Sequence, residues 1–197
     1  MNINLEHWCP KIIGYVDNPD HKKIDKKLIK VCNTLQNKIE KGGKEWVSNK
    51  TYNTLGKHNL HEDKNFKNLI EWVSSNVALY ADQLNYKNNF KCVQSWFNIY
   101  KKYDYQEYHT HSLNTLSAVY FLKSNQKKSS RIFFKVDSDP TLNDPISKSY
   151  NSFNSSVVWY EAVPGRLLIF RSNLSHCVER SEENDTRISL AFNYNNQ

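Results

Sequence analysis

The sequence predicts a mainly β fold with N-terminal helices, and two observations support this. In the first half, apolar residues recur every three or four positions in two stretches, which is the spacing of an amphipathic helix. From about residue 93 the spacing changes to two, and the segments become short and rich in β-branched and aromatic residues. Helices followed by strands, with no helix-length pattern between the strands, indicate an antiparallel sandwich, barrel or jelly roll.

Two helices are expected in the first half, over about residues 22–40 and 64–84. The first carries an apolar stripe and ends before Gly42 and Gly43, which break helices. The second repeats the same spacing. We expect both stripes to face the core and both helices to lie against the outside of the sheet. Nearer the N-terminus, we expect Trp8 to anchor the chain by burying its indole.

Six strands are expected in the second half. They cover residues 95–100, 116–122, 130–135, 156–162, 166–170 and 187–194. The segment 136–155 is rich in Ser, Asp, Asn and Pro and is expected to form a long loop between two of them. Because the chain has 197 residues and no evident linker, it predicts one domain over 1–197, with helical support in about 1–90 and a β core in about 93–197.

The composition restricts partners and location. The 27 Lys and Arg residues outnumber the 20 Asp and Glu residues, for a formal charge of +7, which can attract an anionic substrate or nucleic acid. No basic helix or aromatic-basic RNA signature accompanies the charge, so nucleic acid is not the preferred partner. The four Cys are widely spaced and no secretory segment is visible, so a reduced, cytoplasmic protein is expected. No run approaches the roughly 18 apolar residues of a membrane helix, so no membrane partner is expected.

Three histidines of the second half form a candidate metal site. His109 and His111 lie two apart at the start of a strand-like stretch, where alternation points both imidazoles to the same side. A lone pair of this kind is a weak motif. His176 strengthens it, because it opens a strand after the turn at 164–165 and an apolar strand. Imidazole binds Fe, Zn, Cu or Ni, and a facial set with open positions is typical of non-haem Fe(II) oxygenases.

Arg187 is a candidate anion receptor. It stands eleven positions after His176 and heads another strand that reads as buried. Burying a guanidinium costs desolvation energy unless an anion lies against it. Its planar fork suits two parallel hydrogen bonds to a carboxylate. The sequence therefore predicts three nitrogen ligands followed by an anion receptor in a β context.

These motifs, in this order, resemble a known superfamily. The matching segments are residues 96–100, 109–111, 116–122, 164–176 and 187–189, within about 93–195. Together they resemble the Fe(II)/2-oxoglutarate-dependent dioxygenases. Within these, the chain looks most like the prolyl-hydroxylase branch and the 2OG-Fe(II) oxygenases common in phages and marine bacteria. For a phage-encoded member, the expected location is the cytoplasm of the host. The resemblance implies a double-stranded β-helix, which is a jelly-roll or cupin-like fold, supported by helices. It also implies a hydroxylase that couples 2-oxoglutarate decarboxylation to C–H oxidation.

The resemblance also implies a role for individual residues. Three would bind Fe(II) at the catalytic centre: His109, His111 and His176. Three would hold the co-substrate 2-oxoglutarate: Arg187 on its distal carboxylate, with Ser189 and Tyr100 assisting. The other partners would be O₂ and an unknown substrate, for which a peptide or protein side chain is the first expectation.

One position departs from the usual pattern. Most members of the superfamily have a carboxylate two residues after the first ligand, whereas this chain has His111. Either three histidines hold the metal, which we prefer, or a carboxylate from elsewhere joins His109 and His176. Glu107 has the same strand parity as the two histidines, and Asp137 and Asp139 lie on the expected loop.

Two other functions stay open at this point. One is a three-His cupin-type metalloenzyme that does not use 2-oxoglutarate. The other is a non-catalytic jelly-roll module that binds an acidic partner. The first would not need Arg187, and the second would not need a metal.

Overall fold

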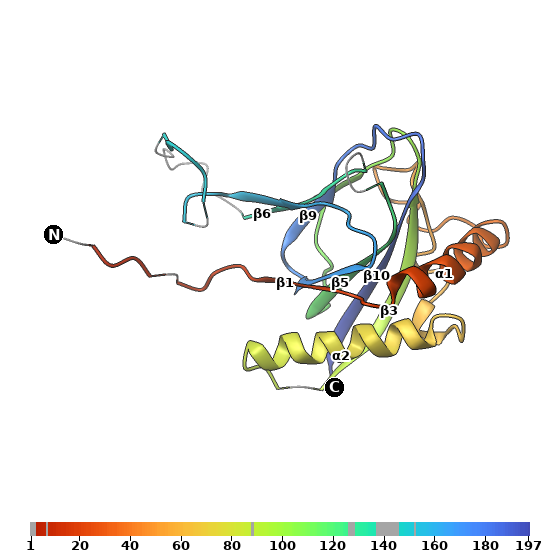
Figure 1. Ribbon diagram of the computed structural model, residues 1–197, viewed down its shortest axis with the longest axis horizontal. Coiled ribbons are helices and arrows are strands. Elements are labelled where there is room, and N and C mark those ends of the chain that lie inside the picture. Colours follow the sequence, from red (N-terminus) through yellow and green to blue (C-terminus); the bar gives the residue numbers. More distant parts are fainter. Residues whose placement is uncertain (1–2, 7, 88, 126–128, 137–145, 152) are drawn as a thin grey trace.

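Two antiparallel sheets face each other in the computed structural model, which describes residues 3–6, 8–87, 89–125, 129–136, 146–151 and 153–197 (Figure 1). The larger sheet has the strand order β1 (Ile13–Asp17), β8 (Arg166–Arg171), β5 (Leu116–Lys123), β10 (Arg187–Asn196), β3 (Phe90–Tyr100) and β2 (Tyr52–Asn53). The smaller sheet has the order β4 (Gln106–His109), β9 (Ser175–Val178), β6 (Ile132–Lys135) and β7 (Val157–Tyr160). This is the expected antiparallel jelly roll, the double-stranded β-helix of the resemblance.

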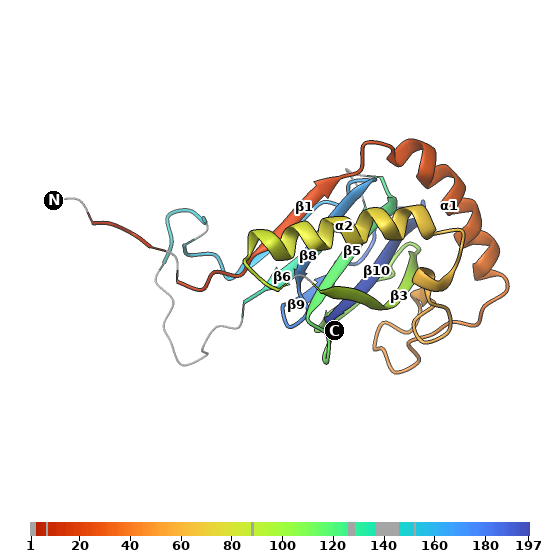
Figure 2. The same ribbon diagram turned by 90° about the horizontal axis from the view of Figure 1, so that it is seen from below.

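Two helices cover the outer face of the larger sheet. They are α1 (His21–Gln36) and α2 (Lys67–Gln83), and a short 3₁₀ turn, η1 (Leu60–Glu62), precedes α2. Figure 2 shows α2 lying across β8, β5 and β10. The predicted position of the helices, against the outside of the sheet, is confirmed.

The central strands are buried on both faces, and this divides the core into two layers. On β5, Ala118 and Tyr120 pack toward the helices, whereas Val119 and Phe121 pack toward the smaller sheet. Since successive side chains of a strand point to opposite faces, β10 divides in the same way. Its even-numbered residues from Ile188 to Tyr194 join the helical layer, so the odd-numbered residues between Arg187 and Asn193 face the space between the sheets.

The first helix is shorter than expected. It ends at Gln36 rather than near residue 40. The backbone N–H of Lys38 donates to the carbonyl of Leu35, three residues back and 2.9 Å away, which is the tighter hydrogen bond typical of a helix end. The carbonyl of Ile39 accepts a hydrogen bond from the Tyr52 hydroxyl instead of a helical N–H. The apolar spacing thus continues beyond the helix that it predicted.

All six expected strands are present, and the structure adds others. β3 begins at Phe90, five residues before the expected start. β1 and β2 lie in the region expected to supply only helical support, and they pair with β8 and β3. The expected loop over 136–155 is described only at 136, 146–151 and 153–155, so most of it lies outside the described residues.

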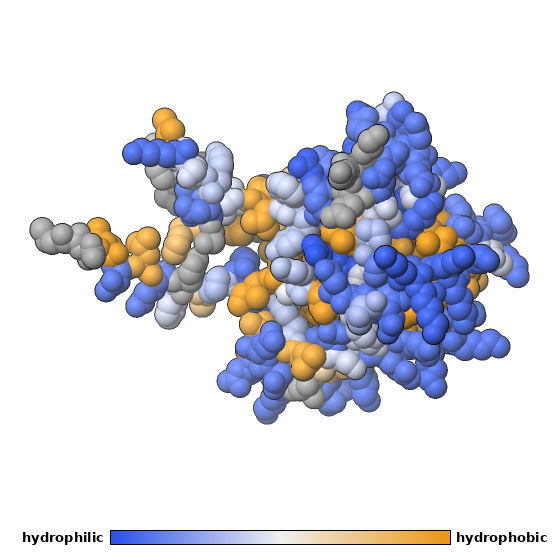
Figure 3. All heavy atoms as spheres, viewed as in Figure 1, coloured by the Kyte–Doolittle hydropathy of each residue, from blue (hydrophilic) through white to orange (hydrophobic). Residues whose placement is uncertain are grey.

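The indole of Trp8 is not buried, so that expectation was wrong. The side chain is 92% exposed, and Ile3 and Leu5 are also exposed. The chain enters the sheet only at Ile13, and the segment before it extends beyond the edge of the sheet (Figure 1). Figure 3 shows apolar side chains along this segment, away from the largely hydrophilic body. None of the helices in the described parts of the chain has both the length and the apolar character needed to cross a membrane.

Candidate active site

One cavity between the two sheets brings together the six residues of the preferred site assignment. Its lining includes His109, His111, His176, Arg187, Ser189 and Tyr100. They come from β4 and the segment after it, from β9, from β10 and from β3. Apolar side chains complete the wall, among them Val119, Ile132 and Val178. The cavity therefore combines ionisable and polar side chains with an apolar wall.

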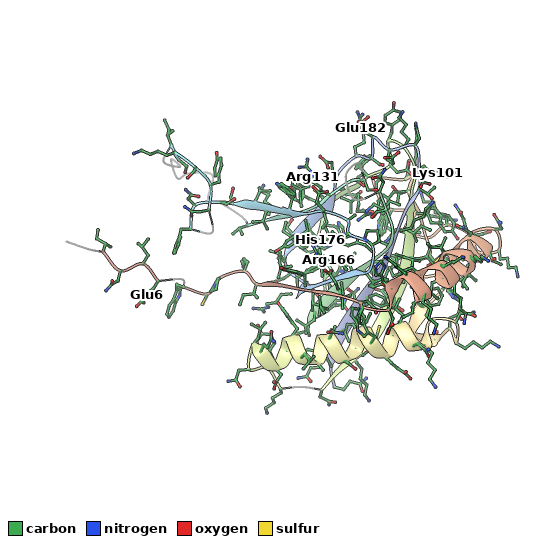
Figure 4. All side chains as sticks on the ribbon, viewed as in Figure 1. Glu6, Lys101, Arg131, Arg166, His176 and Glu182 are labelled. Carbon is green, nitrogen blue, oxygen red and sulfur yellow. The ribbon has the colours of Figure 1, made fainter. Side chains whose placement is uncertain are left out.

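The three histidines form a cluster that can hold a metal ion. One ligand atom from each lies within 4.8 Å of the other two. His109 and His176 are paired across β4 and β9, and their ring centroids are 4.3 Å apart. The ring of His111 lies 5.2 Å from His109 and 5.0 Å from His176. Figure 4 labels His176 inside the molecule, between the two sheets.

His111 reaches the cluster by a route that differs from the expected one. β4 ends at His109, so His111 lies beyond the strand and strand alternation does not place it. Its backbone N–H instead donates to the carbonyl of Ser172, at 2.9 Å, in the turn before β9. The prediction that the two imidazoles share one side is confirmed, but its reason was wrong.

Hydrogen bonds select one nitrogen on two of the rings. Nδ1 of His109 lies 2.8 Å from the carbonyl oxygen of Glu107, and Nδ1 of His176 lies 2.9 Å from that of Leu174. A carbonyl oxygen can only accept, so each Nδ1 carries the proton and donates. Nε2 of each ring is then left with a free lone pair, the form in which imidazole binds a metal.

Burial keeps the cluster uncharged. It lowers the pKa of His109 and lowers that of His111 to about 4. It lowers the pKa of His176 well below its ordinary value, and the neighbouring His109 and His111 lower it further. At neutral pH all three rings therefore present neutral imidazoles.

Arg187 lies elsewhere on the cavity wall, and no carboxylate of the described residues pairs with it. Its side chain is only 1% exposed, and Nε and both terminal nitrogens make no hydrogen bond to the described residues. Its guanidinium carbon lies over the rings of Tyr100 and Phe121, at 4.6 and 5.3 Å. Burial lowers its pKa, and the interaction with Tyr100 raises it. A buried cation of this kind needs an anion to satisfy its N–H groups.

Comparison with known protein families shows to which family the chain belongs. Residues 94–193, slightly more than half of the chain, match a family model described as "Putative 2OG-Fe(II) oxygenase". The chain belongs to the 2OG-Fe(II) oxygenase family. It is therefore an Fe(II)- and 2-oxoglutarate-dependent oxygenase, which confirms the expected enzyme class and cofactors. A comparison with curated proteins gave no match to the sequence.

Solved structures show the same fold. A prolyl-4-hydroxylase from Pseudomonas putida is 11% identical, with 95% of this chain and 94% of that one covered and a TM-score of 0.62. The α-ketoglutarate-dependent carbocyclase SnoK from nogalamycin biosynthesis is 10% identical, with coverage of 94% and 80% and a TM-score of 0.70. A Trichoplax adhaerens prolyl hydroxylase in complex with a hypoxia inducible factor peptide is 12% identical, with coverage of 92% and 82% and a TM-score of 0.60. The expected occurrence in phages and marine bacteria stays a prediction.

The oxygenase cavity fits the two groups that the family uses. Neutral imidazoles suit Fe(II), which binds such nitrogens readily. The unpartnered guanidinium of Arg187 suits a carboxylate, which can accept two of its N–H groups. The donor set and the orphaned cation thus agree with a metal and a dicarboxylate held in one cavity.

Glu107 is engaged elsewhere. Its two carboxylate oxygens accept the backbone N–H groups of Val47 and Ser48, at 2.9 and 3.1 Å. Burial raises its pKa, but these hydrogen bonds outweigh burial and lower it overall. The pairing of β4 with β9 is irregular between Gln106 and His109, so parity counted back from His109 is unsafe there. Asp137 and Asp139, also named as alternative ligands, lie outside the described residues.

Three further residues of the cavity were not assigned a role from sequence. They are Trp96, Asn98 and Gln106, all at most 6% exposed. Nε1 of Trp96, Oδ1 of Asn98 and Oε1 of Gln106 find no hydrogen-bond partner in the parts of the chain that the structure describes. The alternation of β3 places Trp96 and Asn98 on the same face as Tyr100, so that signal was available. Gln106 had no such signal, because β4 was not predicted to begin there.

Proposed function

We propose that this oxygenase binds Fe(II) through Nε2 of His109, His111 and His176 and holds the distal carboxylate of 2-oxoglutarate through Arg187. One observation carries the proposal. The guanidinium of Arg187 is buried and unpartnered in the same cavity as the three imidazoles. Burying an unpaired cation costs desolvation energy, and an anionic ligand bound to the guanidinium would offset that cost. A three-His enzyme that does not use 2-oxoglutarate would have no use for this cation.

The chain supplies position and environment for the reaction. Fe(II) and 2-oxoglutarate, once bound, would supply the oxidation with O₂: one oxygen atom would enter succinate as 2-oxoglutarate loses CO₂, and the other would convert a substrate C–H bond to a hydroxyl. Arg187 fixes the co-substrate at one end, and the ring of Tyr100 lies against the guanidinium and limits its movement. Ser189 follows Arg187 by two residues on β10 and pairs with Asn98 of β3. It adds a hydroxyl to the same face of the strand as Arg187. Val119, Ile132 and Val178 exclude water.

Three neutral imidazoles change the charge of the metal site. A His, His and carboxylate set contributes one negative charge, whereas His109, His111 and His176 contribute none. With its distal carboxylate paired to Arg187, 2-oxoglutarate would bring one negative charge to Fe(II) and leave one positive charge on the metal uncompensated. We therefore propose that metal and co-substrate bind this chain with strong mutual dependence, since each reduces the uncompensated charge of the other.

For the substrate, we propose a peptide or protein side chain that is hydroxylated. A second cavity of about 210 Å³ shares five residues with the first: Trp46, Trp96, Gln106, His109 and His111. One side chain can enter a space of this size, and two indoles offer it an apolar surface. Likeness to prolyl hydroxylases supports a peptide, whereas likeness to a carbocyclase of nogalamycin biosynthesis keeps small molecules in the comparison.

The test is reconstitution of the metal-free protein. Anaerobic calorimetry with Fe(II) should detect one metal site and, once the metal is bound, one site for 2-oxoglutarate. On admitting O₂ with a panel of peptides and small molecules, succinate should form with an oxidised product. Arg187→Met serves as the control, which should bind Fe(II) but not 2-oxoglutarate. A reconstituted wild type that neither binds nor consumes 2-oxoglutarate would refute the proposal.

A further inference from the structure

His111 is held by a side chain that no sequence motif pointed to. Nδ1 of its ring lies 2.6 Å from Oδ1 of Asn193 and 2.9 Å from Oγ of Ser117. Asn193 and Ser117 are at most 2% exposed, and His111 is 9% exposed. His109 and His176 differ in this respect, because their Nδ1 groups meet backbone carbonyls. The protonation of His111 therefore depends on side chains.

The partners of Asn193 settle which of its atoms faces the ring. Its Nδ2 donates to Oε1 of Gln94 at 2.8 Å, so its Oδ1 turns toward His111. The hydroxyl of Ser117 donates to the same oxygen, at 2.9 Å, and lies 2.8 Å from the hydroxyl of Ser172. In this network Oδ1 accepts twice, and Nδ1 of His111 must carry the proton.

The tautomer of His111 decides whether this residue can bind a metal, a constraint that a carboxylate at the same position would not have. A carboxylate offers either oxygen to a metal, whereas a neutral imidazole binds only through the nitrogen that lacks the proton. Were Nε2 of His111 protonated, the ring would point an N–H group at the ion. Replacing the usual carboxylate by His111 therefore creates a need for a hydrogen-bond acceptor behind the ring.

The pairing of β10 with β3 places that acceptor, Asn193, on the same face of the two strands as Arg187. β10 and β3 are in register at Arg187 and Tyr100 and, six residues along, at Asn193 and Gln94. The register shifts directly after Asn193, where β3 has one extra residue. One face of two strands thus carries the predicted carboxylate anchor at one end and the support of His111 at the other.

We propose that Asn193, oriented by Gln94, is a positioning residue that fixes His111 as a neutral ligand with Nε2 free. The inference rests on the proposed metal-binding role of His111. It assigns a function to Asn193 and Gln94 that neither the family match nor the three-His cluster implies. Asn193 acts through the ring and does not contact the metal.

Two measurements on three variants test this. The first is ¹⁵N NMR of the imidazoles in the metal-free protein, which reads the tautomer without any metal. The second is calorimetric titration with Co(II), with melting temperature recorded alongside. Asn193→Leu removes the acceptor, Asn193→Asp keeps an acceptor and adds a negative charge, and Asn195→Leu is the matched control on the same strand. The side chain of Asn195 bonds the backbone of Leu113 and Thr115 rather than His111.

The wild type should show His111 protonated at Nδ1. Asn193→Leu should lose that preference and bind Co(II) about 10–100-fold more weakly, the usual effect of removing an outer hydrogen-bond partner of a metal-bound histidine. Asn193→Asp should retain the tautomer and bind Co(II) more tightly than wild type. Asn195→Leu should match the wild type in both measurements.

The inference is overturned if the apoprotein carries the proton on Nε2 of His111, or if Asn193→Leu binds Co(II) as tightly as wild type. It is also overturned if Asn193→Asp loses the tautomer, which keeps the test decisive even where Asn193→Leu does not fold. A wild type that binds no Co(II) or Fe(II) would refute the proposed function instead, and the tautomer of His111 would still decide the role of Asn193.

Discussion

Arg187 lies directly opposite Tyr100 across β10 and β3, with its guanidinium carbon 4.6 Å from the centre of the Tyr100 ring. An aromatic face partly stabilises a cation but satisfies none of its N–H groups. All three guanidinium nitrogens lack a hydrogen-bond partner among the described residues. In the ligand-free protein Arg187 is therefore a source of instability that a bound carboxylate would remove.

Replacing Arg187 by Met should affect stability and binding in opposite directions. The apoprotein should gain about 1–4 kcal/mol in free energy of unfolding, because an unpaired buried charge is replaced by an apolar side chain of similar length. Binding of 2-oxoglutarate should weaken by about 100-fold or more, the loss of two charge-assisted hydrogen bonds. Urea denaturation and calorimetry measure the two effects. A variant that is less stable than wild type would contradict this account of Arg187.

The choice between His111 and a carboxylate as third ligand can be made by iron analysis. His111→Ala should lower Fe(II) affinity by more than about 100-fold, since a direct ligand contributes more than its outer partners. Glu107→Ala should leave the affinity within about threefold of wild type, because its carboxylate is occupied by Val47 and Ser48. Full iron occupancy in His111→Ala, together with loss of iron in Glu107→Ala, would show that the assignment is wrong.

Glu107 should instead hold the segment that carries Trp46 against the cavity. The indole of Trp46 also packs closely against Gly43, which has a φ of +54°. A Cβ added at Gly43 would lie 2.9 Å from the indole. In Glu107→Ala the N–H groups of Val47 and Ser48 lose their acceptors. We therefore expect the free energy of unfolding to fall by about 1–2 kcal/mol and amide exchange to become faster at both residues. Hydrogen exchange measures this. Glu45→Ala, at an exposed position of the same segment, is the control and should leave both exchange rates unchanged.

The metal-free protein should lose stability on acidification because of its histidines. Burial lowers the pKa of His111 from the ordinary 6.5 to about 4, so the unfolded chain takes up a proton below pH 6.5 and the folded chain only below about pH 4. Stability therefore falls as pH drops from 6.5 to 4, by about 3 kcal/mol for this residue.

Asp25 acts with the opposite sign in part of the same range, since burial raises its pKa to about 6. The comparison is therefore between wild type and His111→Leu, by urea denaturation at pH 7 and pH 4. The variant should lose less stability than wild type over that interval. An equal loss in both proteins would mean that His111 does not titrate as its burial requires.

Much of the fold was predictable because it depends on local periodicity. The period of two in the second half predicted all six main strands, and the period of three to four predicted both helices. The same alternation sorted Arg187 and Ser189 onto one face of β10. Short strands such as β2, at Tyr52–Asn53, carry too few residues for a pattern, and they form only because a partner strand is present.

The identities of the site residues were also a property of the sequence. Imidazoles and a guanidinium in a β context have few uses, and their order along the chain resembled one family. How they meet was decided by tertiary structure alone. His111 lies outside the strand that was expected to place it, held by Ser172 and Asn193 from distant segments. Glu107, which parity alone placed beside the histidines, is bonded to Val47 and Ser48, sixty and fifty-nine positions away.

The sequence by itself therefore determined which segments have the periodicity of helices or strands and which side chains could bind a metal or an anion. The tertiary structure decided which side chains hold the ring of His111, which carboxylate is occupied, and that Arg187 has no hydrogen-bond partner among the described residues. The physical reason is that hydrogen bonds between buried side chains join residues far apart in the chain, and no local pattern records them.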